Sequence, residues 1–309
     1  GGVILVKTKR GKEGKVKVSY TSTYGLSDAT RMPELMSAYD QAIALNDYTR
    51  GYYKWNQADL LANCLNDKRT YFSDEELNQL RNLNYNWLDY AWKSAFQTRQ
   101  NISISGGTDK SRYYAGGSYM FQNGNFDNLS MNKYTMRVAL DVDLSKDWTL
   151  SAGISANKKD VSMPYNALDK EPEKMYNTFS TLLRTPKWMP AYIDGLPVGQ
   201  NGTLLSHPLY INDINSYKKS YSGDVTANLA LEWKISWIKG LKARATFDYQ
   251  TGNSGGITYA KPYYLYNFAT IATEYTTGLI PTNVLNSTTP KTLIQNGNKY
   301  QQSGNTSES

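Results

Sequence analysis

Apolar and polar residues alternate with a period of two through several long segments of this chain. Between residues 134 and 144 every second position is apolar: Tyr134, Met136, Val138, Leu140, Val142 and Leu144. Because successive side chains of a β-strand point to opposite faces, each such segment predicts a strand with one apolar and one polar face. Strands of about ten residues with this pattern are typical of transmembrane β-barrels, whereas strands in soluble proteins usually have about five or six residues.

The alternation predicts seven barrel-type strands, starting at Lys15. They cover about residues 15–21, 100–105, 112–122, 134–144, 148–157, 225–235 and 241–250. From Gly252 onward the chain is polar and rich in Thr and Asn, and it shows no further strand pair.

The connections between these strands alternate in length. Short turns fall at residues 106–110, 145–147 and 236–240, and longer connections at about 27–99, 123–131, 158–221 and 252–309. All short turns therefore lie at one end of the sheet, as expected of periplasmic turns opposite extracellular loops. Trp148, Trp233 and Trp237 flank the short turns and suit an interfacial aromatic girdle, although tryptophans in the core of a sandwich are the alternative.

The long connections are expected to contain short helices. Helical spacing of apolar residues predicts one helix over Pro33–Asn46, and a capping box at Ser73–Glu76 predicts the start of another. The connections also hold many aromatic residues: Tyr52, Tyr53, Trp55, Tyr165, Trp188, Tyr192, Tyr210, Tyr263, Tyr264 and Tyr266. These rings could stack on sugars or contact peptides, or they could simply pack the loops.

The two faces of the strands have different expected surroundings. Leu140, Ile154, Leu229 and Leu231 are predicted to face lipid, and Arg137, Asp141, Lys234 and Arg244 to face a hydrated lumen. An unpaired sheet edge in lipid costs several kcal/mol per backbone group, so the sheet must close. Seven strands with polar inner faces suit only part of a wide barrel, so we expect the chain to be a fragment of a larger one.

Composition resembles that of a soluble protein, but it does not exclude a barrel, because only half of each strand would face lipid and the loops are polar. The chain has 309 residues, 40% of them hydrophobic, and a mean hydropathy of −0.60. No run approaches the roughly 18 apolar residues of a membrane helix. The N-terminal residues 1–6 lack the charged region of a signal peptide and are expected to lie inside a domain. The net charge of +7 is scattered, and the cluster at Lys7–Lys12 is interpreted as a solvated turn, with no nucleic-acid partner.

Candidate chemistry is sparse. One histidine excludes a multi-histidine metal site, and one cysteine, Cys64, excludes an internal disulfide. A catalytic triad would need His207, which precedes Pro208 in a loop with no nucleophile motif. Acidic residues of the long loop (Asp160, Asp169, Glu171 and Glu173) lack calcium-loop spacing. The sequence therefore predicts no enzyme, no cofactor and no metal, and it leaves the substrate-binding residues unassigned.

Several motifs resemble one known family. Residues 2–11 resemble the end of the plug domain in SusC/RagA-type TonB-dependent outer-membrane transporters, and residues 101–114 look like that family's hairpin between its second and third strands. Asn84–Trp87 resembles a motif upstream of that hairpin, with Asn86 where the family usually has Asp. Residues 119–124 and 134–147 resemble the strands that follow. The resemblance is specific over about residues 1–160 and looser over 220–250.

The resemblance implies both an architecture and a function. Residues 1–14 would be the C-terminal end of the plug, and residues 15–309 the N-terminal part of an all-β, antiparallel transmembrane barrel of about 22 strands. The family imports oligosaccharides or peptides with a SusD-like surface lipoprotein and with TonB, which acts through a region outside this chain. The expected location is the outer membrane of a Gram-negative, Bacteroidetes-type bacterium. A passive porin or surface-binding barrel without energy coupling is the main alternative, and a soluble all-β binding module is another.

Overall fold

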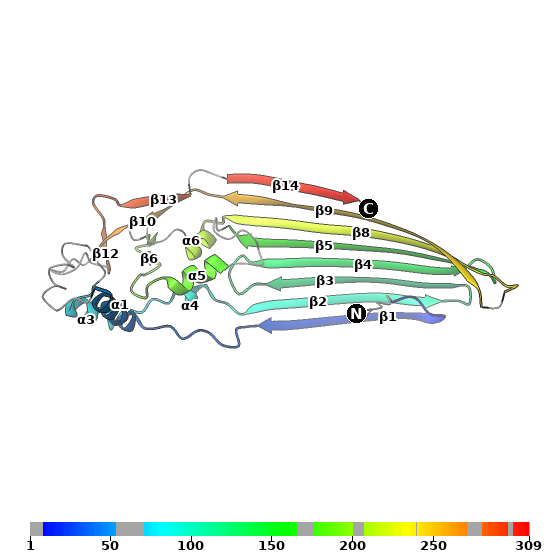
Figure 1. The fold of residues 1–309 in the computed structure, drawn as a ribbon, viewed down its shortest axis with the longest axis horizontal. Helices are drawn as coiled ribbons and strands as arrows, with labels where there is room; N and C mark the ends of the chain where they lie inside the picture. The colour runs from blue at the N-terminus through cyan, green and yellow to red at the C-terminus, as the bar shows by residue number, and fades with distance from the viewer. Residues whose placement is uncertain are drawn as a thin grey trace.

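The structure, a computed structural model, consists of one long antiparallel sheet with a cluster of loops at one end (Figure 1). It describes residues 9–53, 71–165, 176–199, 207–238, 240–270, 280–295 and 299–308. The sheet has eight strands, which pair in the order β1 (Gly14–Ser27), β2 (Ala95–Gly107), β3 (Ser111–Asn123), β4 (Ser130–Asp143), β5 (Trp148–Pro164), β8 (Tyr217–Lys234), β9 (Lys242–Ala260) and β14 (Lys299–Glu308).

The seven predicted strands are confirmed as β1 to β5, β8 and β9, and several are longer than predicted. The expectation that no further strand pair follows Gly252 is wrong, because β9 continues to Ala260 and pairs with β14, and because short strands within residues 263–270 pair with others within residues 281–295. The sequence of β14, KYQQSGNTSE, has no apolar alternation. Its place in the sheet is given by backbone pairing along β9, a kind of interaction that leaves no periodic signal.

The alternation of short and long connections is also confirmed. Residues 108–110, 144–147 and 235–241 join neighbouring strands at one end of the sheet, and the long connections leave from the other end, where the helices lie (Figure 1). We call the described residues of the connections 28–94, 165–216 and 261–298 the loop head. Its helices are α1 (Ala38–Tyr53), α3 (Asp74–Leu80), α4 (Trp87–Ala91), α5 (Tyr176–Arg184) and α6 (Pro208–Asp213). Its short strand pairs are β6 (Tyr192–Ile193) with β7 (Leu196–Pro197), β10 (Tyr263–Tyr266) with β13 (Lys291–Gln295), and β11 (Phe268–Thr270) with β12 (Pro281–Leu285).

Both predicted helices exist, but the first begins and ends later than predicted, at Ala38 and Tyr53 instead of Pro33 and Asn46. α3 begins after Ser73, whose hydroxyl accepts the Glu76 N–H while the Glu76 carboxylate accepts the Ser73 N–H, so the capping box is confirmed. α1 begins at Ala38 rather than at Pro33, because the Ser37 hydroxyl accepts the N–H of Asp40 and ends the preceding extended segment.

The hydrophobic core of the described residues lies in the loop head rather than in the sheet. Its larger cluster contains Trp87, Leu88, Ala91, Leu182, Met189, Ala191, Val198, Ile211, Tyr263, Leu265 and Phe268. A second cluster contains Ala38, Ala42, Phe72, Leu80, Trp188 and Ile280. The long connections are therefore a packed unit that bridges several strand ends.

The register places the predicted residues on opposite faces of the sheet. Successive pairs join Leu140 to Ala152, Ala152 to Leu229 and Leu229 to Phe247, so these side chains share what we call the apolar face. The opposite, polar face carries Arg137, Asp141, Lys234 and Arg244, as predicted. The apolar face is uncovered: Val18 is 68% exposed, Leu229 49% and Phe247 67%. Two sheets packed over a shared core, the arrangement of a soluble sandwich, are not seen in the described residues.

On the apolar face, the part of each strand that carries apolar side chains shifts steadily toward the short turns from β1 to β9. On β1 it reaches Leu26, whereas on β9 it ends at Tyr249, which lies in the same cross-strand row as Val18. This is a shift of about one residue per strand. With a rise of about 3.4 Å per residue and about 4.8 Å between strands, a level apolar belt requires a strand tilt of about 35–45°, the value found in membrane barrels.

Aromatic residues mark the end of this belt near the short turns. The rings of Trp148 and Trp233 stack with centroids 5.3 Å apart, and Trp237 meets Trp233 edge-on at 5.5 Å. Trp237 is 74% exposed, which is inconsistent with a sandwich core. Among the described helices, none has both the length and the apolar character needed to cross a membrane.

Arginine substitutions on adjacent residues of β8 test the assignment of the faces. Leu229→Arg places a charge on the apolar face and should lower the free energy of unfolding by about 2–4 kcal/mol near the bilayer midplane. Asn228→Arg, on the polar face, should cost much less. The measurement is refolding of the full-length protein into bilayers, and equal costs for the two variants would show that the faces are wrongly assigned.

Candidate functional site

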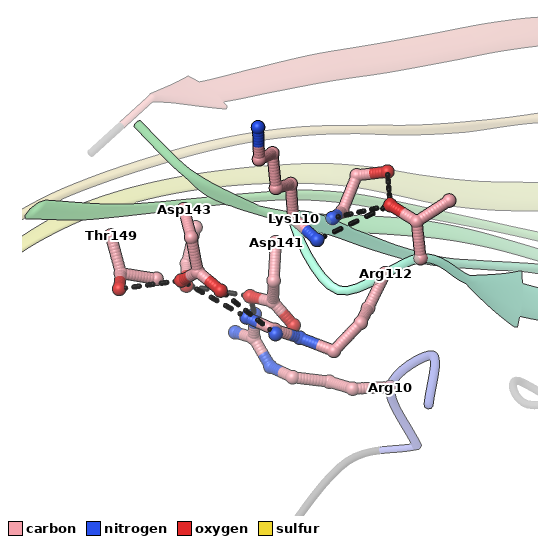
Figure 2. Close-up of polar contacts among 9 residues, drawn as sticks. Arg10, Lys110, Arg112, Asp141, Asp143 and Thr149 are labelled. Atoms are coloured by element: carbon pink, nitrogen blue, oxygen red, sulfur yellow. Dashed lines mark hydrogen bonds and ion pairs between the residues drawn. The ribbon is translucent and has the colours of Figure 1, made fainter. Parts of the chain in front are cut away.

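The segment before β1 is fastened to the polar face of the sheet. Arg10 forms an ion pair with Asp141 of β4, which also accepts a hydrogen bond of 2.6 Å from the Ser151 hydroxyl (Figure 2). Gly11 lies directly against β3, since a Cβ on it would be 2.4 Å from the backbone N and O of Tyr113. Only glycine allows this close approach, so the charge pair and the bare backbone together define where the segment sits.

A second ion pair lies beside the first. Arg112 of β3 donates to both carboxylate oxygens of Asp143 at 3.0 and 3.2 Å, and the Thr149 hydroxyl donates to the same carboxylate at 2.8 Å (Figure 2). Every carboxylate in this cluster is thus paired and hydrogen-bonded. Such a network can hold a segment in place, whereas a general acid or base would need a group free to exchange its proton.

Removing Arg10 should loosen the N-terminal segment. Asp141, with a side chain 11% exposed, would keep Ser151 but lose its cation, so Arg10→Ala should cost about 1–3 kcal/mol. The matched control is Lys12→Ala, which removes a cation from an exposed residue of the same segment. A double-mutant cycle with Asp141→Asn in the full-length protein measures the coupling, and a coupling of zero would show that the ion pair does not fasten the segment.

The loop head is organised around the indole of Trp87 and the single histidine of the chain. Trp87 of α4 is buried and donates its indole N–H to the Met189 carbonyl at 2.8 Å. Its ring lies 4.5 Å from the ring of His207, which also contacts Tyr192 and Tyr210. The Asn84–Trp87 motif thus joins the first long connection to the second.

His207 acts as a neutral structural residue. One ring nitrogen, Nδ1, accepts the Tyr210 N–H at 3.1 Å and caps α6, while Nε2 lies 2.9 Å from the Ala191 carbonyl and must carry the proton to donate to it. Both nitrogens are occupied, and the side chain is fully buried. Burial lowers the pKa of His207 to about 4, because the charged form loses its hydration.

The buried histidine makes the loop head sensitive to acid. Above pH 6.5 His207 is neutral whether the loop head is folded or locally unfolded. Between pH 6.5 and 4 only the locally unfolded form binds a proton, so the loop head loses stability as the pH decreases, and this loss levels off below pH 4. The full loss is about 3 kcal/mol. Exchange of the α6 amides, corrected for the intrinsic rate, measures it. His207→Gln should remove this pH dependence, and an unchanged profile would refute the assignment.

A hollow of about 400 Å³ opens beside this cluster. Its lining includes Tyr85, Tyr90, Asp127, Tyr192, Asn212 and Asp213. Tyr192 donates its hydroxyl to Asp213 at 2.5 Å, and burial raises its pKa, so the phenol stays protonated. Lys93 pairs with Asp127 at 2.6 Å, and the side-chain oxygen of Asn212 is buried without a partner. Rings beside hydrogen-bonding groups can hold a sugar or a peptide, and the size suits a small ligand.

The structure separates the predicted loop aromatics into two groups. Trp188 and Tyr263 are buried in the core, and Tyr192 and Tyr210 pack on His207, so packing accounts for them. Tyr52 and Tyr264 are exposed. Trp55, Cys64, Asp169, Glu171 and Glu173 lie outside the described residues, as do residues 1–8. Sequence reasoning missed the hollow, because its lining comes from several separate connections and has no common motif.

The described residues offer no constellation for metal chemistry. No group of three or more His, Cys, Asp or Glu side chains in that part of the chain could hold a metal ion. His207 has both ring nitrogens engaged and is not placed beside a serine hydroxyl with a hydrogen bond.

Comparisons with known proteins agree with this architecture. No protein-family model matches the chain. TonB-dependent receptor P3 of Formosa agariphila is 23% identical over 153 residues, which make up 50% of this chain and 13% of that protein. Among solved structures, the RagAB peptide transporter is similar with a TM-score of 0.58 and 17% identity, and the RagAB peptide importer in its open–open state with 0.57 and 18%.

The similarity concerns part of a larger molecule. Each RagAB comparison covers 82% of this chain but only 30% of the solved chain, so the chain spans less than a third of these relatives. The resemblance to SusC/RagA-type TonB-dependent transporters that the motifs indicated is confirmed, and the fold is that of a partial β-barrel. The named relatives are receptors and transporters rather than enzymes.

Proposed function

We propose that this chain is part of an outer-membrane, TonB-dependent importer of oligosaccharides or peptides. The observation that carries the proposal is a sheet with an uncovered apolar face and a charged opposite face, whose short turns all lie at one end. Such a sheet suits a barrel wall between lipid and a wide hydrated lumen. The loop head would then lie at the extracellular mouth, with its hollow available to an incoming substrate.

The proposal includes the domain boundary and the partners. Residues 1–14 are the end of the plug and residues 15–309 the first part of the barrel, so the Arg10–Asp141 pair is a contact between plug and wall. A SusD-like surface lipoprotein would deliver substrate to the loop head, and TonB would supply energy through a region outside this chain. The RagAB systems are described as peptide transporters, which keeps peptides beside oligosaccharides as candidate substrates.

Genetics in the native host tests the transport proposal. Deleting the full-length gene should abolish growth on one class of oligosaccharide or peptide as the limiting nutrient, and deleting TonB should give the same phenotype, because import against a gradient needs energy. A mild-detergent purification should recover a surface lipoprotein with the transporter. Growth that depends on the gene but not on TonB would instead support the passive porin, which shares the barrel but has no energy coupling.

A further inference from the structure

The apolar face has a recess beyond the end of its apolar stretch that is nearest the loop head. It lies across β5, β8, β9 and β14 and has a volume of about 640 Å³. Most of its lining residues project to the apolar face, and the others occupy alternate positions of the same strands. The polar lining residues on the apolar face are Lys158, Asp160, Tyr221, Thr251, Asn253 and Thr306. The recess is thus a polar depression on a face that is otherwise apolar.

The strand register explains why the wall is hollow here. Gly223 of β8 pairs with Lys158 on one side and with Asn253 on the other, so the floor of the recess has no side chain. A Cβ on Gly223 would lie 3.0 Å from the side-chain oxygen of Asn253, so a larger residue would disturb the lining. Tyr221 closes the recess toward the loop head, because its ring lies over Gly255 of the neighbouring strand.

The recess lies at the level where the apolar belt ends. On the same face of β8, Val225 follows Gly223 and begins the apolar stretch, and on β9 Tyr249 ends the stretch just before Thr251. The exposed rings of Tyr221 and Tyr249 suit the aromatic girdle of a membrane interface. In the orientation proposed above, this level is that of the headgroups of the outer leaflet. A molecule that fills the recess would therefore have its polar part there and an apolar part beside the belt.

The polar lining on this face is neutral overall and rich in hydrogen-bonding groups. Lys158 pairs with Asp160 at 3.2 Å, so the two charges compensate each other. Within the part of the chain that the structure describes, the side chains of Tyr221, Asn253 and Thr306 have no hydrogen-bond partner. An amide and hydroxyl groups can both donate and accept hydrogen bonds, which matches the hydroxyl groups of a sugar better than a phosphate.

We propose that this recess binds the sugar headgroup of a glycolipid of the outer leaflet, whose acyl chains lie along the apolar face. The inference rests on the proposed function, which places this face in the outer membrane. The Asn253 amide and the hydroxyls of Thr306 and Tyr221 form hydrogen bonds with the sugar, and the Tyr221 ring contacts its apolar side. A soluble oligosaccharide would gain nothing from the adjoining apolar surface, and the lumen through which it would pass lies on the opposite face of the sheet.

Lipid binding to the full-length transporter in detergent tests the site. The probes are lipid A, whose headgroup is a glucosamine disaccharide, phosphatidylethanolamine, which has a phosphate but no sugar, and the soluble disaccharide chitobiose. Native mass spectrometry measures the fraction of transporter that carries each probe over a range of concentrations. We expect lipid A to bind about tenfold more tightly than phosphatidylethanolamine, because its hydroxyl groups satisfy the free groups of the recess, and more tightly than chitobiose, which lacks acyl chains.

Substitutions on the two faces of β9 and β14 provide a matched control. Asn253→Leu with Thr306→Val removes two hydrogen-bonding groups from the recess and should lower the affinity for lipid A about fivefold or more, with little effect on phosphatidylethanolamine. Thr258→Val with Asn305→Leu makes the same changes in the same two strands on the polar face and should leave the affinity for lipid A unchanged. Yield in the outer membrane checks that each variant folds.

The outcomes separate this inference from the transport proposal. Equal losses in the two variant pairs, equal binding of lipid A and phosphatidylethanolamine, or binding of chitobiose as tight as that of lipid A would overturn the glycolipid site. Thr306→Trp, which fills the recess without changing its charge, should also weaken the binding of lipid A. TonB-dependent growth that persists while lipid binding fails these tests would leave the transport function standing without the site, and growth independent of TonB with lipid A bound as expected would do the reverse.

Discussion

Continuous strand pairing in a single register is the constraint on which the rest of this structure depends. From β2 to β9 the strands of the large sheet pair without a shift in register, and β1 pairs with β2 with a register shift between Gly14 and Lys17. Because a slip of one residue would exchange the two faces, this register simultaneously decides which side chains are uncovered, which ion pairs form and where the wall is hollow. The contact between Arg10 and Asp141 is one consequence of it.

The sequence predicts the sheet well because strand faces obey a local rule. The alternation at residues 134–144 and 225–235 is visible without any long-range information, and so is the capping box at Ser73. β14 escapes prediction for the opposite reason, since its polar side chains carry no periodic signal and its pairing with β9 is made by backbone groups. The length of β5 and β8 is likewise underestimated, because their ends beyond Asn157 and before Val225 turn polar as they approach the loop head.

The loop head could not be derived in the same way. Trp87, Met189 and His207 are far apart in the chain and meet only in the folded core, so no spacing rule connects them. The abundance of aromatic residues is visible in the sequence, but only burial in the folded chain separates those that pack from those that remain exposed. The lone histidine illustrates this, since a residue type associated with catalysis is here a buried cap whose two nitrogens are both engaged.

The stacked pair Trp148 and Trp233 has a consequence for how the sheet assembles. The two rings come from strands separated by residues 165–216, yet their planes differ by only 4°. Closing a connection of that length carries an entropic cost that a tight hairpin avoids, so pairing of β5 with β8 is expected to be slower than that of β4 with β5. Parallel indoles at 5.3 Å couple optically. The optical coupling of Trp148 and Trp233 therefore reports when the strands β1 to β5 pair with β8 and β9 to form one sheet.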